Sequence, residues 1–176
     1  LKADEIRQIL DETFAHQEVE DKRILIIIPD KTRTAPSPLF FRLFHELLFP
    51  VARKLDYLVA LGTHQPLSES ELCELVGISP QERTAEFKEI GIYNHLWADP
   101  ETFVRLGTIS RSEIETIVGD SIRHLPQDAG LLRDVPVTLN RMVLDYDLVV
   151  ICGPTFPHEV VGFSGGNKYF FPGISG

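Results

Sequence analysis

Short apolar runs alternate with polar loops along this chain. Residues 23–28 (RILIII) form a continuous and mainly β-branched run, which is typical of a strand buried on both faces of a parallel sheet. The run ends at Pro29, and a polar loop of residues 30–36 follows it. Residues 56–61 and residues 147–152 repeat this arrangement, each as an apolar run that leads into a polar loop. We therefore expect three strands with chemically active residues at their carboxyl ends.

Amphipathic stretches between these runs predict helices. Residues 3–17 carry apolar side chains at the i, i+3, i+4, i+7 spacing of a surface helix. Ser37 as the N-cap and Pro38 at the first helical position open a helix that reaches about residue 48. Two more helices begin with a serine and a glutamate at the capping-box spacing: Ser68 with Glu71, and Ser79 with Glu82. The first of these two helices ends at Gly77.

The segment from residue 88 to residue 128 has a weaker pattern. Residues 103–109 predict a strand, residues 112–118 are ambiguous between helix and strand, and residues 135–139 predict another strand further on. Strands, polar loops and helices in this alternation predict an α/β fold, a Rossmann-like three-layer domain with a largely parallel sheet. Ligands of such sheets bind beyond the carboxyl ends of the strands, so the polar loops should gather on one rim.

Size and composition narrow the class of protein. A chain of 176 residues with 43% hydrophobic and 24% charged residues suits one soluble domain with a sizeable core. Its net charge of −9 argues against a nucleic-acid partner, because phosphate backbones select basic patches. No apolar run has the length of a membrane span, and the polar N-terminal residues are unlike a signal peptide. Cys73 and Cys152 lie far apart without zinc-site spacing, and the cytoplasm is the expected location.

The residues after the last apolar run carry the most distinctive chemistry. Residues 157–173 (PHEVVGFSGGNKYFFPG) contain His158, the turn Ser164-Gly165-Gly166, and Lys168. Glycine lets the backbone approach a ligand closely, successive N–H groups can hold an anion, and lysine adds a charge or a nucleophilic amine. A P-loop pattern fails at two of its required positions. An ordinary glycine-rich connection between two elements is the alternative interpretation.

The two earlier loops supply polar groups that could meet this segment. Asp30, Thr32 and Arg33 offer an acceptor, a hydroxyl and a guanidinium fork that suits a carboxylate or a phosphate. An Asx turn, in which Asp30 caps its own backbone, explains the same residues equally well. His64 follows the second strand as His158 follows the third. A lone loop histidine is usually structural, but two histidines across a cleft suit acid–base chemistry on opposite faces of a substrate.

The other four histidines carry weaker signals. His16 and His45 fall in predicted helices, and His124 falls in the weakly patterned segment. His95 lies in a loop where ordinary packing is the simpler expectation. No standard metal-ligand spacing connects the histidines, so no metal ligand is predicted in this chain.

Several of these motifs occur together in one known family. The chain resembles the nickel-dependent lactate racemase family at six places: residues 30–36 (DKTRTAP), 62–66 (GTHQP), 94–97 (NHLW), 157–159 (PHE), 164–168 (SGGNK) and 172–173 (PG). The motifs follow the order that they have in the family. An ordered set of this kind is far more specific than any one of its members.

The resemblance implies a cofactor, a reaction and a role for each matched residue. The cofactor is a nickel-pincer nucleotide, a pyridinium mononucleotide with sulfur and carbon ligands to the metal, and Lys168 matches the lysine that holds it covalently through a thioamide. His64 and His158 match paired acid–base histidines, and Arg33 matches an arginine at the substrate anion. The residues implied to line the cofactor are Asp30, Thr32, Ser164, Gly165 and Gly166. The implied reaction racemises or epimerises a lactate-type 2-hydroxy acid, with a histidine taking the hydroxyl proton while the Cα hydrogen moves as hydride.

The resemblance also has limits. Family members are considerably longer, so residues 1–176 are expected to be an incomplete N-terminal, cofactor-bearing domain that is inactive without its C-terminal domain and a distal nickel ligand. Gln65 stands where many relatives carry a basic residue, so the hydroxy acid need not be lactate. The competing interpretation is a non-catalytic domain that binds a nucleotide or an organic anion, which would not need Lys168 or both histidines. A nucleotide hydrolase is disfavoured by the failed P-loop pattern.

Overall fold

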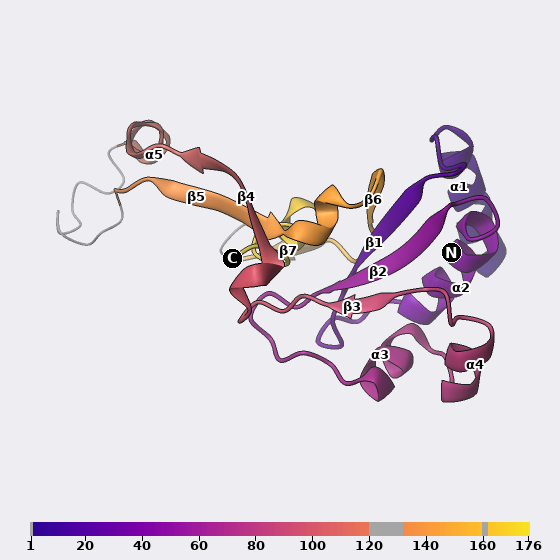
Figure 1. The fold of residues 1–176 in the computed structure, drawn as a ribbon. Helices are drawn as coiled ribbons and strands as arrows, with labels where there is room; N and C mark the ends of the chain where they lie inside the picture. The colour runs from indigo at the N-terminus through magenta and orange to yellow at the C-terminus, as the bar shows by residue number, and fades with distance from the viewer. Residues whose placement is uncertain (1, 120–131, 160–161) are drawn as a thin grey trace.

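A four-stranded, wholly parallel sheet forms the centre of the molecule (Figure 1). The computed structural model describes residues 2–119, 132–159 and 162–176. The sheet has the order β3-β2-β1-β6, and its strands are β1 (Arg23–Pro29), β2 (Lys54–Ala60), β3 (Ile92–Asn94) and β6 (Leu148–Ile151). The prediction of an α/β fold with a largely parallel sheet is confirmed, although the short strand β3 was not predicted.

Strand β1 is buried on both of its faces. Ile24, Ile26 and Ile28 pack into one hydrophobic cluster, while Leu25 and Ile27 pack into a second cluster on the other side of the sheet. The two sets alternate because successive residues of a strand point to opposite faces. This double burial explains why the run is apolar at every position, as the sequence predicted.

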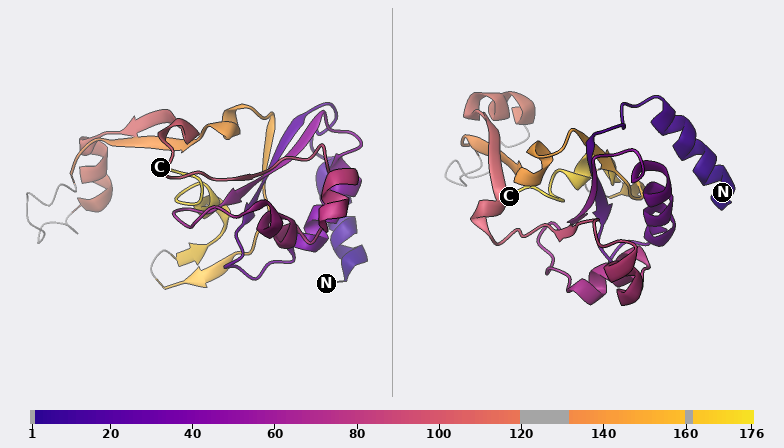
Figure 2. Two further views of the ribbon diagram at one scale, coloured as in Figure 1. Left: turned by 60° about the horizontal axis from the view of Figure 1, so that its bottom comes forward. Right: turned by 45° about the vertical axis from the view of Figure 1, so that its right-hand side comes forward.

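Helices cover one face of the sheet (Figures 1 and 2). They are α1 (Ala3–Ala15), α2 (Ser37–Leu48), α3 (Glu69–Val76) and α4 (Pro80–Ala85). The predicted capping boxes are present, because Ser68 accepts from the Glu71 N–H and Ser79 accepts from the Glu82 N–H. Gly77 ends α3 in the left-handed conformation with φ 67°, which glycine adopts without strain.

Two helix boundaries differ from the prediction. Ser37 is the first residue of α2 and Pro36 is the N-cap, so the prediction that Ser37 caps this helix was wrong. The N–H groups of Leu39 and Phe40 both donate to the Pro36 carbonyl, at 3.0 and 3.2 Å, so the first turn closes one residue earlier. Helix α1 ends at Ala15, two residues before the predicted end, and His16 is its C-cap.

The opposite face of the sheet is covered by the C-terminal part of the chain. Two 3₁₀ helices, η3 (Arg141–Leu144) and η4 (Gly166–Tyr169), belong to this layer. Tyr169 and Ile174 are buried here together with Leu25, Ile27 and Leu58 of the sheet. The packing of Tyr169 and Ile174 therefore fixes the segment that carries Lys168 against the sheet.

Two antiparallel pieces extend from this body. Strands β4 (Phe103–Ile109) and β5 (Val135–Asn140), with α5 (Arg111–Val118) beyond them, form a ribbon that projects away from the sheet, and η1 (Pro100–Thr102) precedes it (Figure 1). Strands β7 (Phe156–His158) and β8 (Gly162–Ser164) form a hairpin, yellow in Figure 2. The ambiguous segment 112–118 is thus helical, and the hairpin was not predicted.

Some predicted features fall outside the described residues. They are His124 and, within the glycine-rich segment, Val160 and Val161. In the part of the chain that the structure describes, no helix has both the length and the apolar character needed to cross a membrane.

Candidate active site

A pocket of about 250 Å³ lies at the carboxyl ends of β1 and β2, where the three polar loops meet. The loops after β1 and β2 meet because these strands pair in parallel up to Pro29 and Ala60, so both loops leave the sheet at the same level. The predicted site residues that line the pocket are Asp30, Thr32, Arg33, His64, Ser164, Gly165 and Lys168. Residues up to 138 positions apart in sequence thereby share one surface.

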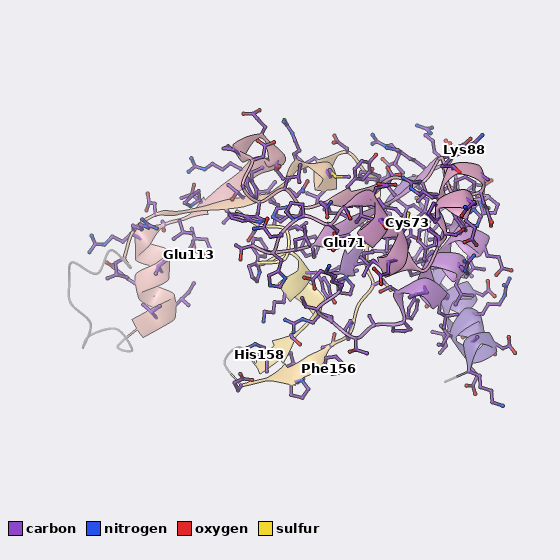
Figure 3. The ribbon with its side chains drawn as sticks, turned by 90° about the horizontal axis from the view of Figure 1, so that it is seen from below. Glu71, Cys73, Lys88, Glu113, Phe156 and His158 are labelled. Carbon is purple, nitrogen blue, oxygen red and sulfur yellow. The ribbon has the colours of Figure 1, made fainter. Side chains whose placement is uncertain are left out.

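Two predicted site residues do not line this pocket. Gly166 follows Gly165 in the same turn and begins η4. His158 ends β7 and pairs with Gly162 across the hairpin. Figure 3 shows His158 close to Phe156 on a hairpin that projects from the body of the molecule. The structure therefore brings His64 into the pocket and leaves His158 outside its lining, although Phe156 and Ser164 of the same hairpin do line it.

Asp30 links the first two loops. It is only 5% exposed, and its Oδ2 lies 2.5 Å from Nδ1 of His64. Its Oδ1 accepts hydrogen bonds from the backbone N–H of Thr32, at 3.1 Å, and from the Thr32 hydroxyl, at 2.6 Å. The interpretation as an Asx turn is therefore confirmed for one oxygen of Asp30, and the other oxygen binds a histidine from the neighbouring loop.

The hydrogen bond of this pair defines which ring nitrogen of His64 carries a proton. Burial alone raises the pKa of Asp30, but the hydrogen bonds from Thr32 and His64 outweigh it and the pKa is lowered. Asp30 is thus ionised at neutral pH, and a carboxylate can only accept. Nδ1 of His64 must therefore carry a proton, which leaves Nε2 as the basic nitrogen of the neutral ring. The His64 side chain is 56% exposed, so Nε2 is accessible to a ligand.

Arg33 and Lys168 bring positive charge to the pocket. Among the described residues, neither side chain forms a salt bridge or a hydrogen bond. Lys31, in the same loop as Arg33, is by contrast paired with Glu71 of α3. Two uncommitted cations beside one buried carboxylate suit an anionic ligand that carries a carboxylate or a phosphate.

The glycine turn holds the backbone of Lys168 beside the pocket. Gly165 has φ 91°, and a Cβ there would clash with the Pro154 carbonyl oxygen and lie 2.7 Å from Thr155 Oγ1. Gly166 has φ 55°, but a Cβ there would meet no atom within 4 Å. The Lys168 N–H donates to the Gly165 carbonyl at 3.1 Å and closes the turn. Gly165 is thus needed for close packing, whereas Gly166 faces open space.

Two residues at and after the end of β3 contact the His64 loop, and no role was predicted for either of them. The indole N–H of Trp97 donates to the His64 carbonyl at 2.9 Å. The Asn94 side chain bonds both the N–H and the carbonyl of Leu67, at 3.0 and 2.8 Å. His95 between them is fully buried, as expected for an ordinary packed loop, and its burial lowers its pKa. The only signal in the sequence was the motif NHLW itself.

The structure also bears on metal binding by protein side chains. Over residues 2–119, 132–159 and 162–176, no three histidine, cysteine, aspartate or glutamate side chains gather in an arrangement that could hold a metal ion.

Fold and site together define an α/β domain with a pocket, lined by Arg33 and Lys168, at the carboxyl edge of a parallel sheet. The chain belongs to the lactate racemase N-terminal domain family, which it matches over residues 2–123 and 130–176. The family resemblance of the sequence motifs is thereby confirmed.

Two curated relatives are lactate racemases. The one from Lactiplantibacillus plantarum is 27% identical over 97% of this chain, and the one from Thermoanaerobacterium thermosaccharolyticum is 29% identical over 98% of it. The chain covers 35% of each relative, so it spans about a third of their length.

Two solved structures share the fold. A protein from Thermotoga maritima is 27% identical and superposes with a TM-score of 0.81, with 99% of this chain and 39% of that one covered. The lactate racemase apoprotein from T. thermosaccharolyticum is 23% identical and has a TM-score of 0.65, with 96% and 36% covered.

Proposed function

We propose that this chain is the cofactor-bearing N-terminal domain of an enzyme that racemises or epimerises a 2-hydroxy acid of the lactate type. The observation that carries the proposal is the pocket that joins Lys168, Arg33 and the Asp30–His64 pair in a member of the lactate racemase N-terminal domain family. Residues 1–176 alone are expected to be inactive, and the cytoplasm is the expected location.

The residues of the pocket fit a nickel-pincer nucleotide attached through Lys168. Lys168 lines the pocket, and the open space beside Gly166 leaves room for an adduct on the neighbouring amine. Thr32 and Ser164 line the same pocket and offer hydroxyl groups to a polar cofactor. Its volume of about 250 Å³ is close to the lower end of small-molecule sites, about 300 Å³. When bound, this cofactor supplies an acceptor for the hydride from the substrate Cα.

The side chains of the pocket divide the remaining work. Arg33 would hold the substrate carboxylate through its guanidinium fork. Nε2 of His64 would take the hydroxyl proton, and the ionised Asp30 would stabilise the resulting imidazolium and keep the ring oriented. His158 would serve the opposite enantiomer. Support for its role is the position of its hairpin, since Phe156 and Ser164 line the pocket.

A non-catalytic domain for a nucleotide or an organic anion is the second candidate. The two uncommitted cations, Arg33 and Lys168, favour it because they alone would suffice for anion binding. Such a domain would have no need for a buried carboxylate that fixes the tautomer of an exposed histidine. The Asp30–His64 pair therefore favours the enzyme.

Intact-mass and nickel measurements on the longer natural protein test the proposal. The wild type should carry a covalent adduct and bound nickel, and Lys168→Ala should lose both. Lys31→Ala is the matched control, because this nearby lysine is paired with Glu71 and should leave the adduct intact. An adduct that survives Lys168→Ala would show that the attachment point is wrong and that the turn only holds an anion.

A further inference from the structure

The loop that carries His64, residues 61–67, has no helix or strand to hold its shape. Leu61 and Leu67 are buried at its two ends, and residues 63–66 between them are exposed. The His64 N–H donates to the Leu61 carbonyl at 2.9 Å, which forms a turn but does not tie the loop to another element. The position of the imidazole relative to Asp30 therefore depends on contacts from outside the loop, one of which is at its start, where the Gly62 N–H donates to the Gly173 carbonyl at 2.9 Å.

Trp97 makes such a contact at His64 itself. Its indole N–H donates to the His64 carbonyl at 2.9 Å, and an indole N–H has no other hydrogen-bonding role. Trp97 is 36% exposed, so this hydrogen bond lies at the surface of the molecule. This bond fixes the backbone at the residue whose side chain meets Asp30.

Asn94 makes the second contact, at the end of the loop. Its amide nitrogen donates to the Leu67 carbonyl at 2.8 Å, and its amide oxygen accepts from the Leu67 N–H at 3.0 Å. These two hydrogen bonds resemble those between neighbouring strands of a sheet. They use both the donor and the acceptor of the side-chain amide. Asn94 is the last residue of β3, so the loop is tied directly to the sheet.

The segment that makes both contacts is itself firmly anchored. His95 lies between them at 0% exposure, and its N–H donates to the Val59 carbonyl of β2 at 3.2 Å. Its Nδ1 lies 3.2 Å from Nδ2 of Asn140, and its ring meets Phe103 edge-on with centroids 5.4 Å apart. Because this segment is fixed to the sheet, its hydrogen bonds to the His64 loop can fix the position of that loop relative to the sheet.

We propose that Asn94 and Trp97 are positioning residues that hold His64 in hydrogen-bonding distance of Asp30. Neither lines the pocket or contacts the reacting groups, and they act through the backbone of the loop. The catalytic consequence rests on the proposed function, whereas the geometry can be tested without any activity.

Nuclear magnetic resonance on this chain tests the geometry through the His64 imidazole. Trp97→Phe keeps an aromatic ring and removes only the indole donor, while Asn94→Ala removes the paired bonds to Leu67. Both variants should weaken or broaden the low-field Nδ1–H signal of His64. The His64 backbone amide should exchange about fivefold faster with solvent, as expected for the loss of one hydrogen bond. The melting temperature of Trp97→Phe should fall by no more than about 3 °C.

Tyr93→Phe is the matched control. Tyr93 is an exposed aromatic residue of β3 next to Asn94, and among the described residues its side chain forms no hydrogen bond with the His64 loop. It should leave the His64 signals unchanged. If Trp97→Phe leaves them unchanged as well, the indole bond does not position the histidine and the proposal is overturned. Because Asn94→Ala could also unfold the segment, Trp97→Phe carries the decision.

Kinetics of the longer protein separate this proposal from the proposed function. Trp97→Phe should lower kcat about tenfold, because small displacements of a catalytic group are costly, while KM and the Lys168 adduct stay unchanged. An active enzyme with unaltered kcat and unaltered His64 signals in this variant would overturn the positioning role. A protein with no racemase activity in any form, but with the expected His64 changes, would overturn the proposed function alone.

Discussion

Replacing Tyr57 with phenylalanine should stabilise this protein, which is the opposite of the usual effect of a core substitution. Tyr57 lies in β2 at 1% exposure and packs on Phe41 with ring centroids 4.9 Å apart. Within the described part of the chain, its hydroxyl has no hydrogen-bond partner. Its burial also raises its pKa well above the ordinary value, so the hydroxyl stays neutral.

The magnitude follows from the cost of an unpaired buried hydroxyl. Leaving such a group without a partner costs about 1–3 kcal/mol relative to water. Phenylalanine removes that cost and keeps the ring, and it loses only the few contacts of one oxygen atom. We expect Tyr57→Phe to raise the free energy of unfolding by about 1 kcal/mol, which for a domain of this size is about 2–4 °C in Tm.

Tyr146→Phe is the matched control and should have the opposite sign. The Tyr146 hydroxyl donates to the buried carboxylate of Asp56, which also accepts from the Gly91 N–H at 2.7 Å. Loss of a hydrogen bond to a charged acceptor costs about 1.5–3 kcal/mol. Urea titration of both variants should therefore move the midpoint in opposite directions at an unchanged m-value.

One result would refute the reasoning on Tyr57. A cavity of about 170 Å³ adjoins this residue and is lined mainly by apolar groups such as Ile28, Phe44 and Val76. If Tyr57→Phe were destabilised as strongly as Tyr146→Phe, the hydroxyl would have a partner in that cavity. The tyrosine would then be retained for that contact, and the hydroxyl could no longer be called unpaired.

Three further predictions concern the candidate active site. Gly165→Ala should cost about 3 kcal/mol of stability through its backbone clash, against about 1 kcal/mol for Gly166→Ala, which faces open space. Because the pKa of Asp30 is lowered on folding, its ionised form adds stability above about pH 4, and this stability is lost as the pH falls through the pKa of the folded state. In Asp30→Asn, the free energy of unfolding measured with urea should depend less on pH in that range. If the proposed function is correct, racemisation by the longer protein in D₂O should leave little deuterium at Cα, whereas extensive solvent labelling would show that the histidines remove the Cα proton directly.

The parallel sheet could be predicted because burial on both faces leaves a direct mark on the sequence. Residues 23–28 are apolar at every position, and only a central strand of a parallel sheet needs that. Strand β3, of three residues, is too short to show a periodicity, and it was missed for that reason. Hairpin β7–β8 was missed because Pro157 and Gly162 read as loop residues, and its strands are also only three residues long.

That most of the predicted site residues line one pocket could be predicted, although His158 and Gly166 do not line it, and the contacts of the site residues could not be predicted. Asp30, Arg33, His64 and Lys168 each follow a strand in the sequence, and a parallel sheet brings such positions to one edge. Which oxygen of Asp30 would bind Thr32 and which would bind His64 depends on side-chain geometry that no periodicity records. The bonds from Asn94 and Trp97 cross 27 and 33 residues and involve backbone atoms of the loop, so the residue types at their far ends carry no signal.

The two histidines that are equivalent in the sequence are therefore unequal in the structure. His64 lines the pocket beside Asp30, and its loop is tied to the sheet by Asn94 and Trp97. His158 lies outside the pocket lining on a two-stranded hairpin, an element that is only marginally stable without packing from other elements. Values of kcat/KM alone cannot expose this difference. The equilibrium constant between two enantiomers is one, so kcat/KM stays equal in the two directions whichever histidine is defective. Measurements on each imidazole separately are needed, because only these report which half of the proposed reaction is already organised within this chain.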